Sequence, residues 1–170
     1  DDILLLTLKL FEGHSEAMEP IRERYHYLMV DEYQDTNRVQ YQLMCHLCQR
    51  HRNLCVVGDD DQSIYGWRGA DIRNILDFER DFPEAKIIRL EQNYRSTPTI
   101  LKAANQVISQ NPQRMPKELW SQKPTGVPLE WIESKDEAEE LELVARRIKV
   151  QVLRHGRSHS DYAILFRSNF

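Results

Sequence analysis

One run of ten residues, Leu28 to Asn37 (LMVDEYQDTN), constrains the fold of this chain more than any other stretch. A hydrophobic strand that stops at Asp31 and Glu32 places both carboxylates at the carboxyl edge of a sheet, where open α/β folds bind ligands. The first acid can then hold a magnesium ion, and the second can orient a water molecule toward a terminal phosphate. Taken alone, the run is explained equally well as an acidic strand end without chemistry.

Apolar periodicity along the chain predicts an α/β protein in which strands alternate with helices. Short apolar runs indicate strands at residues 26–30, 54–57, 86–90, 129–132 and 162–166. Helical spacing and capping residues indicate helices at residues 1–11, 38–50, 72–80 and 136–154, and a further helix that starts at residues 96–98. Repeated strand–helix units imply a parallel sheet with helices packed on it.

Two further polar runs follow predicted strands, Val56 to Asp71 (VVGDDDQSIYGWRGAD) and Leu90 to Thr97 (LEQNYRST). Together with the acidic run, they resemble the second, third and fourth motifs of superfamily 1 DNA helicases of the UvrD/Rep/PcrA type. The resemblance covers nearly the whole chain and keeps the order of the motifs. It implies the parallel sheet of a RecA-like P-loop NTPase. Residues 1–83 would be the C-terminal part of the first RecA-like domain, and residues 84–170 the beginning of the second.

In the first motif, the resemblance makes Asp31 the magnesium ligand and Glu32 the base that orients water. Both roles agree with the chemistry of the two carboxylates. We expect Gln34 and Asp35 to shape the nucleotide edge. Asp35 or Thr36 has an alternative role, which we favour: either can cap the helix that follows.

The second motif combines a phosphate-sensing amide with an aromatic pair. Gln62 is a neutral donor and acceptor suited to a terminal phosphate and its attacking water, and the resemblance assigns it that role. Tyr65, Trp67 and Arg68 form the predicted DNA-binding group, because flat rings can stack on unpaired bases and an arginine can reach the backbone. The alternative for Trp67 is an ordinary core position. We expect at least one of Asp59–Asp61 to be a solvated turn residue.

The third motif supplies a cation for the phosphates. Arg95 can stabilise the charge that spreads over a transferring phosphoryl group, with a surface salt bridge as the alternative role. The resemblance lets Tyr94 stack on adenine. The predicted catalytic residues are therefore Glu32, Gln62 and Arg95, and the predicted cofactors are ATP and Mg²⁺.

Bulk properties add little to these motifs. The net charge of −4 argues weakly against nucleic acid, but binding driven by local stacking does not depend on net charge. No apolar run reaches the length of a membrane span, so we expect a cytoplasmic protein without a membrane partner. Cys45, Cys48 and His51 have the close spacing of zinc ligands. A partly buried helix face explains them better, because a second ligand pair is missing. Trp120 and Trp131 are expected to be packing residues.

The phosphate-cradling pattern GxxxxGK[ST] is absent from the sequence. We therefore expect an internal piece of an ATP-dependent 3′–5′ DNA helicase that acts on single-stranded DNA and duplex junctions. The remaining segments of the same helicase would be its partners, and the isolated chain would hydrolyse ATP negligibly. The alternatives are the helicase part of a RecB/AddA-type helicase–nuclease and a non-catalytic DNA- or nucleotide-binding remnant.

Overall fold

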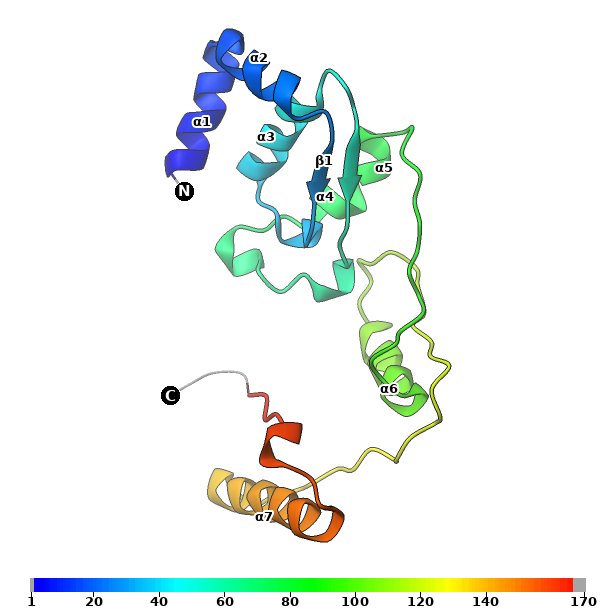
Figure 1. The fold of residues 1–170 in the computed structure, drawn as a ribbon. Helices are drawn as coiled ribbons and strands as arrows, with labels where there is room; N and C mark the ends of the chain where they lie inside the picture. Colours follow the sequence, from blue (N-terminus) through cyan, green and yellow to red (C-terminus); the bar gives the residue numbers. More distant parts are fainter. Residues whose placement is uncertain (1, 167–170) are drawn as a thin grey trace. The chain divides into compact units, whose positions relative to one another are not determined.

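The structure is a computed structural model that describes residues 2–166, and the chain divides into two compact units at Thr125 (Figure 1). The helices and strands of the first unit are α1 (Asp2–Gly13), α2 (Ser15–Arg24), β1 (Leu28–Val30), α3 (Arg38–Cys48), β2 (Leu54–Val56), α4 (Arg73–Leu76), α5 (Phe78–Asp81) and α6 (Pro98–Ile108). The second unit contains α7 (Glu137–His155). Single 3₁₀ turns lie at Tyr33–Asp35, Gly66–Arg68, Asp60–Gln62 and His159–Asp161.

Strands β1 and β2 form a parallel pair with Leu28 opposite Leu54, Met29 opposite Cys55 and Val30 opposite Val56. Side chains alternate across a strand, so the two faces of the pair differ. Residues 28, 30, 54 and 56 pack against the helical core, whereas Met29 and Cys55 are exposed on the other face. The α/β class and the parallel pairing of the first two predicted strands are therefore confirmed.

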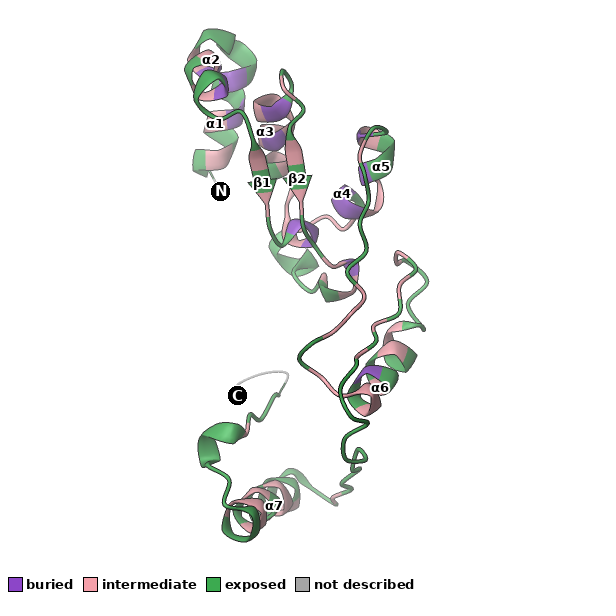
Figure 2. Cartoon of the chain, turned by 45° about the vertical axis from the view of Figure 1, so that its right-hand side comes forward, coloured by how far each residue is buried: buried purple, intermediate pink, exposed green. Residues whose placement is uncertain are grey.

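The core of the first unit lies between this covered sheet face and the helices α3, α4 and α5 (Figure 2). Met44 and Cys48, one turn apart on α3, meet Ile75 and Phe78, and the buried Tyr33 ring contacts Phe78 edge to face with centroids 5.6 Å apart. Burying an aliphatic or aromatic side chain stabilises the fold by about 1.5–3 kcal/mol. This core fixes the carboxyl ends of β1 and β2 relative to each other.

Helix α3 begins at Arg38, as predicted, but its cap differs from the predicted one. Its cap is Asn37, whose side chain accepts a hydrogen bond from Gln40 N at 2.9 Å, while Gln40 Oε1 accepts one from Asn37 N at 2.9 Å. The capping role predicted for Asp35 or Thr36 is therefore wrong. The Thr36 hydroxyl instead donates to the Tyr33 carbonyl at 2.7 Å and so closes the preceding 3₁₀ turn.

The helix predicted at residues 72–80 is two single-turn helices, α4 and α5, divided at Asp77. Ile72 occupies the cap position of α4, and Asp71, one residue earlier, accepts a hydrogen bond from Arg73 N at 3.1 Å. Helix α2 was not predicted. Pro20 lies inside it and most of its side chains are charged or polar, so the sequence carries little helical signal there.

Three predicted strands do not form. Residues 86–90, 129–132 and 162–166 have no ladder partner within the described range, and a β-strand exists only where a neighbour pairs with its backbone. Their apolar side chains lie exposed, and Trp131, predicted to be a packing residue, is 90% exposed. Trp120 is also exposed, although its backbone is paired with Gln92.

The second unit matches its predicted helix. The Asp136 side chain accepts a hydrogen bond from Glu139 N at 2.9 Å at the start of α7, and Gly156 ends the helix with a left-handed φ of 63°. Across residues 2–166, no helix has both the length and the apolar composition needed to cross a membrane.

Candidate nucleotide and nucleic-acid site

The acid loop, Asp31–Asp35, follows directly on β1 and presents two exposed carboxylates at the carboxyl edge of the sheet. Glu32 has a left-handed backbone, with φ of 50° and ψ of 43°, which is uncommon outside glycine and costs about 1–2 kcal/mol. Its amide donates to Asp31 Oδ1 at 2.9 Å.

Gln34 connects the acid loop to the next strand end. It is 1% exposed, and its amide nitrogen donates to Glu32 Oε2 at 2.8 Å. Its amide oxygen accepts a hydrogen bond from Asp59 N at 3.0 Å. The sequence predicted a part for Gln34 at the nucleotide edge but not this bridge, because nothing in the run shows which side chain turns inward.

The bridge depends on a close approach at Gly58. A Cβ atom at this position would lie 2.8 Å from Gln34 Oε1 and 3.2 Å from Tyr33 N. Both distances are below ordinary van der Waals contact, and the second involves backbone. A glycine is therefore required where the two strand ends meet.

In the Gln62 loop, residues 58–63, the exposed side chain of Gln62 is fixed by a hydrogen bond. Gln62 Nε2 donates to Asp59 Oδ2 at 2.7 Å. Asp59 stays partly exposed, in line with the expectation that at least one of the three aspartates is solvated, whereas Asp60 and Asp61 are shielded: the side chains of Asp59, Asp60 and Asp61 are 27%, 3% and 13% exposed. All three face basic groups from residues 114–117, a partner that the local sequence pattern does not indicate.

A cavity of about 400 Å³ opens beside the acid loop. Its walls include Asp31, Glu32, Thr36 and Tyr41. Burial, followed by its hydrogen bond to Asp81 at 2.8 Å, raises the pKa of the Tyr41 hydroxyl. The cavity wall thus includes both carboxylates and a phenol.

The aromatic loop, Tyr65–Gly69, is open. Trp67 is 75% exposed and Tyr65 38% exposed, so Trp67 is not a core residue. The Arg68 guanidinium carbon lies 4.6 Å from the centroid of the Trp67 ring and 5.2 Å from that of the Tyr65 ring. Gly69 ends the turn with a φ of 88°. The structure therefore brings the three predicted DNA-binding side chains into one exposed stack.

The Arg95 loop, Glu91–Ser96, is turned by Asn93, whose side-chain oxygen accepts hydrogen bonds from Arg95 N at 2.9 Å and Ser96 N at 2.7 Å. Tyr94 is 74% exposed, and its hydroxyl donates to Gln92 Oε1 at 3.0 Å. The guanidinium of Arg95 is exposed and makes no ion pair with any residue between 2 and 166. Within that range the salt bridge considered for Arg95 does not occur.

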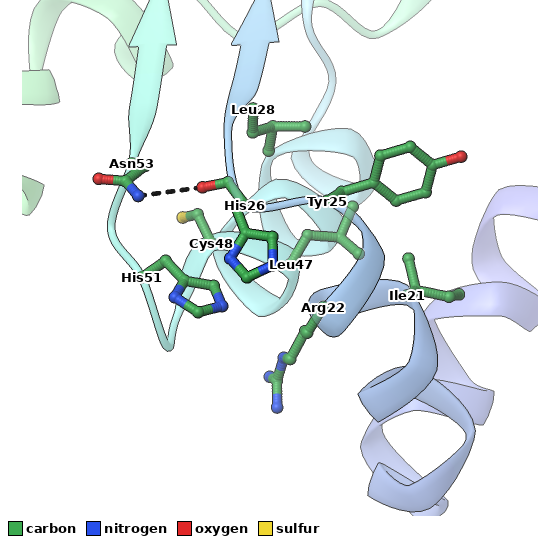
Figure 3. A pocket seen from close by; sticks show the side chains of 9 residues that line it. All are labelled: Ile21, Arg22, Tyr25, His26, Leu28, Leu47, Cys48, His51 and Asn53. Atoms are coloured by element: carbon green, nitrogen blue, oxygen red, sulfur yellow. Dashed lines mark hydrogen bonds between the residues drawn. The ribbon is translucent and has the colours of Figure 1, made fainter.

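A second cavity, of about 270 Å³, lies at the opposite, amino end of β1 and β2 (Figure 3). The rings of His26 and His51 contact each other there with centroids 4.8 Å apart, and Asn53 Nδ2 donates to the His26 carbonyl at 3.0 Å. Cys48 and Leu28 also line it. Among the described residues no three His, Cys, Asp or Glu side chains are grouped as metal ligands. This cavity is separate from the acid loop.

Comparison with known sequences gives the class of protein. The UvrD/REP helicase N-terminal domain matches residues 1–83, and the UvrD-like helicase C-terminal domain matches residues 88–170. The chain belongs to the UvrD/Rep family of helicases, as its three motifs indicated.

Within that family the chain is similar to the ATP-dependent DNA helicase PcrA of Staphylococcus aureus, with 52% identity over 169 residues. The same identity over the same length is found with PcrA of Staphylococcus epidermidis. Each alignment covers 99% of this chain and 23% of the relative, so the chain spans about a quarter of the length of these curated relatives.

Proposed function

We propose that this chain is the part of an ATP-dependent DNA helicase that orients water against ATP and contacts the DNA strand. The parent protein would move 3′ to 5′ on single-stranded DNA and unwind duplex junctions, a polarity that rests on the family resemblance. The observation that carries the proposal is the hydrogen-bonded path from Glu32 through Gln34 and Asp59 to Gln62. It ties a water-orienting acid to a phosphate-sensing amide at one sheet edge.

The acid loop suits a magnesium–nucleotide complex. Asp31 is exposed and uses Oδ1 for the Glu32 amide, so the carboxylate stays at the strand end and would hold the ion. One or two carboxylates, with phosphate oxygens and water, make up a typical Mg²⁺ site. The bound ion would neutralise charge on the phosphate oxygens. Glu32, held at Oε2 by Gln34, keeps its other oxygen for the proton of the attacking water.

Two further groups act on the terminal phosphate. Gln62 has its nitrogen on Asp59, which leaves its carbonyl oxygen to accept a hydrogen bond from the attacking water. Arg95, exposed and without an ion pair among residues 2–166, would stabilise the charge that develops on the phosphoryl oxygens. Tyr94 offers an exposed ring for adenine. The same family assignment makes Glu32, Gln62 and Arg95 the catalytic residues.

The aromatic loop would contact unpaired bases. Tyr65 and Trp67 expose their rings, and the Arg68 guanidinium lies over both of them. When DNA binds, Arg68 can move from the rings to a phosphate and leave the ring faces to the bases. Stacking of a base on an aromatic ring contributes about 1–3 kcal/mol and does not select a sequence. A translocating motor needs such sequence-tolerant contacts.

The domain division of this proposal follows the family. Residues 1–83 would complete a first RecA-like domain and residues 84–170 would open a second. The exposed sheet face at Met29 and Cys55, and the exposed apolar runs at 86–90, 129–132 and 162–166, are then surfaces that the remaining segments of the helicase cover. Apolar strands of a parallel sheet are normally buried on both faces, which supports this assignment.

The first test is to sequence the source DNA on both sides of the segment that encodes this chain. We expect an in-frame GxxxxGK[ST] loop upstream and a further arginine-bearing motif downstream. A nuclease domain farther downstream would favour a RecB/AddA-type enzyme. Stop codons or unrelated sequence on both sides would overturn the proposal in favour of a non-catalytic module.

The second test uses the full-length protein that this sequencing defines, called here the parent helicase. Glu32→Gln should lower DNA-stimulated ATP hydrolysis by about a hundredfold or more, the usual contribution of a general base. The matched control is Glu79→Gln, an exposed acid on α5 outside the acid loop. The isolated 170-residue chain should hydrolyse ATP negligibly. Full turnover in Glu32→Gln would refute the catalytic assignment.

A further inference from the structure

One segment of the first unit, Arg114–Lys123, contacts both the Gln62 loop and the Arg95 loop. It follows α6 and is called the strap here. At its first end, Lys117 Nζ lies 2.8 Å from Asp59 Oδ1, 2.5 Å from Asp60 Oδ1 and 3.0 Å from Asp61 Oδ2. Arg114 binds both oxygens of Asp61, at 2.9 and 2.8 Å. Two cations of the strap therefore hold every carboxylate of the Gln62 loop.

These charges are shielded from water. The side chains of Lys117 and Arg114 are each 16% exposed, and that of Asp60 is 3% exposed. Burial alone lowers the pKa of the Lys117 ammonium, but its hydrogen bonds to Asp59, Asp60 and Asp61 outweigh burial and raise it. Hydrogen bonds from Arg114 lower the pKa of Asp61. The ion pairs of Lys117 and Arg114 with Asp61 therefore favour the charged forms of all three groups.

At its other end the strap is bound to the Arg95 loop through backbone. Trp120 N donates to the Glu91 carbonyl at 3.0 Å, and Asn93 N donates to the Trp120 carbonyl at 2.7 Å. Lys123 Nζ donates to the Arg95 carbonyl at 2.8 Å. The strap also has an anchor on α6, because Asn105 exchanges two side-chain hydrogen bonds with the backbone of Leu119.

The strap thereby joins the two loops through a continuous set of contacts. From Lys117 the path runs to Asp59, whose other oxygen holds Gln62 and whose amide meets Gln34. From Lys117 in the other direction, three residues of backbone lead to Trp120 and the Arg95 loop. The contacts connect the side chains of Glu32 and Gln62 to the backbone of Arg95, the three residues to which the proposed function gives catalytic roles.

We propose that Lys117 is a positioning residue that couples the Gln62 loop to the Arg95 loop, so that the two loops move together when ATP is hydrolysed. The proposal rests on the proposed function for its effect on turnover. Its structural half, the coupling of the two loops, is independent of that function.

The structural half is tested by amide hydrogen exchange, followed by NMR, in the 170-residue chain. Lys117→Met keeps the length of the side chain and removes its charge. It should accelerate exchange by about tenfold at Gln62 N and also at Asn93 N, because both loops lose a shared support. Lys117→Arg should restore most of the protection, and Lys102→Met, an exposed site on α6, should leave it unchanged. Acceleration at Gln62 alone, with Asn93 unchanged, would refute coupling.

The catalytic half is tested in the parent helicase. Lys117→Met should lower kcat for DNA-stimulated ATP hydrolysis by about a hundredfold while KM changes by less, since small misplacements of catalytic groups have effects of that size. Lys117→Arg should recover activity. Wild-type kcat in Lys117→Met, with turnover lost in Gln62→Ala, would refute this inference alone. Unchanged turnover in both Glu32→Gln and Gln62→Ala would instead refute the proposed function.

A variant at the exposed end guards against loss of fold in Lys117→Met. Lys123→Ala removes only the contact to the Arg95 carbonyl. It should raise exchange at Arg95 and Asn93 and, through the strap, at Gln62 by a smaller factor. Faster exchange confined to residues 91–96 would again refute coupling.

Discussion

The Gln62 loop and the aromatic loop are neighbours in sequence and are built in opposite ways. In the first, Gly58 fits against Gln34 and Tyr33, and each aspartate is hydrogen-bonded or ion-paired. In the second, the Arg68 guanidinium contacts the rings of Tyr65 and Trp67, and Trp67 is 75% exposed. A side chain that must be placed within a fraction of an ångström of a phosphate benefits from fixed hydrogen bonds. A side chain that must stack on any base benefits from conformational freedom.

Adding one methyl group to each loop tests this difference most severely. Gly58→Ala should lower the free energy of unfolding by about 3 kcal/mol, because its Cβ collides with Gln34 and with backbone. Gly66→Ala is the matched control: nothing lies within 4 Å of its Cβ, so a change within about 0.5 kcal/mol is expected. Urea unfolding followed by circular dichroism measures both. Equal losses would show that the loops do not differ in packing.

Removal of the buried bridge should have the next largest effect. Gln34→Ala leaves the Asp59 amide without its acceptor and Glu32 without its donor, which should cost about 2 kcal/mol. Gln62→Ala, an exposed glutamine of the same region, should change stability by about 0.5 kcal/mol or less. Urea unfolding measures the free energy of unfolding of both variants. An equal loss of stability in the two would contradict a special role for the bridge.

Lowering the pH should weaken the ion pair that supports the Gln62 loop and so lower the free energy of unfolding. Hydrogen bonds from Arg114 depress the folded-state pKa of Asp61 below its unfolded value near 3.9. The associated stability is therefore present above about pH 4 and is lost as the pH falls through the folded-state pKa. Asp61→Asn should flatten the decline of unfolding free energy below pH 4, and Glu79→Gln should leave it unchanged. An unaltered slope in Asp61→Asn would show that this ion pair does not support the fold.

The smallest effect on stability is expected in the aromatic loop. Trp67→Ala removes an exposed ring and one cation–π contact, so the unfolding free energy should change by no more than about 0.5 kcal/mol. In the parent helicase, the affinity for oligothymidylate should nevertheless fall by about tenfold or more, with Trp67→Phe intermediate. Fluorescence anisotropy measures the affinity. A large stability loss with unchanged affinity would make Trp67 a packing residue.

Local sequence predicted the parts of the structure that depend on local signals. β1 and β2, the helix that begins near Asp136 and the exposure of Trp67 follow from apolar runs, helical spacing and flanking glycines. The predicted roles of the site residues still await measurement, but the structure brings Glu32, Gln34 and Gln62 together at one sheet edge, as their positions after two strands suggested.

Features that depend on distant partners were not predicted. The shielding of Asp60 and Asp61 was not predicted, because Lys117 lies more than fifty residues away in sequence. Residues 86–90 have a strand-like pattern, but a pattern shows only that a segment can pair, and the ladder needs a neighbour. The cap of α3 was wrongly predicted because Asp35, Thr36 and Asn37 are all good capping residues, and only Asn37 forms reciprocal hydrogen bonds with Gln40.

The uncovered face of the β1–β2 pair makes this chain convenient for labelling. Its three cysteines differ in access: Cys48 is buried, Cys45 is half-buried and Cys55 is exposed beside Met29. Burial raises the pKa of the Cys45 and Cys48 thiols, which slows their reaction with alkylating reagents. A maleimide dye should therefore attach to Cys55 without mutagenesis. The emission of this dye would then change when another protein segment binds to the exposed face of the β1–β2 pair, and binding could be followed in real time.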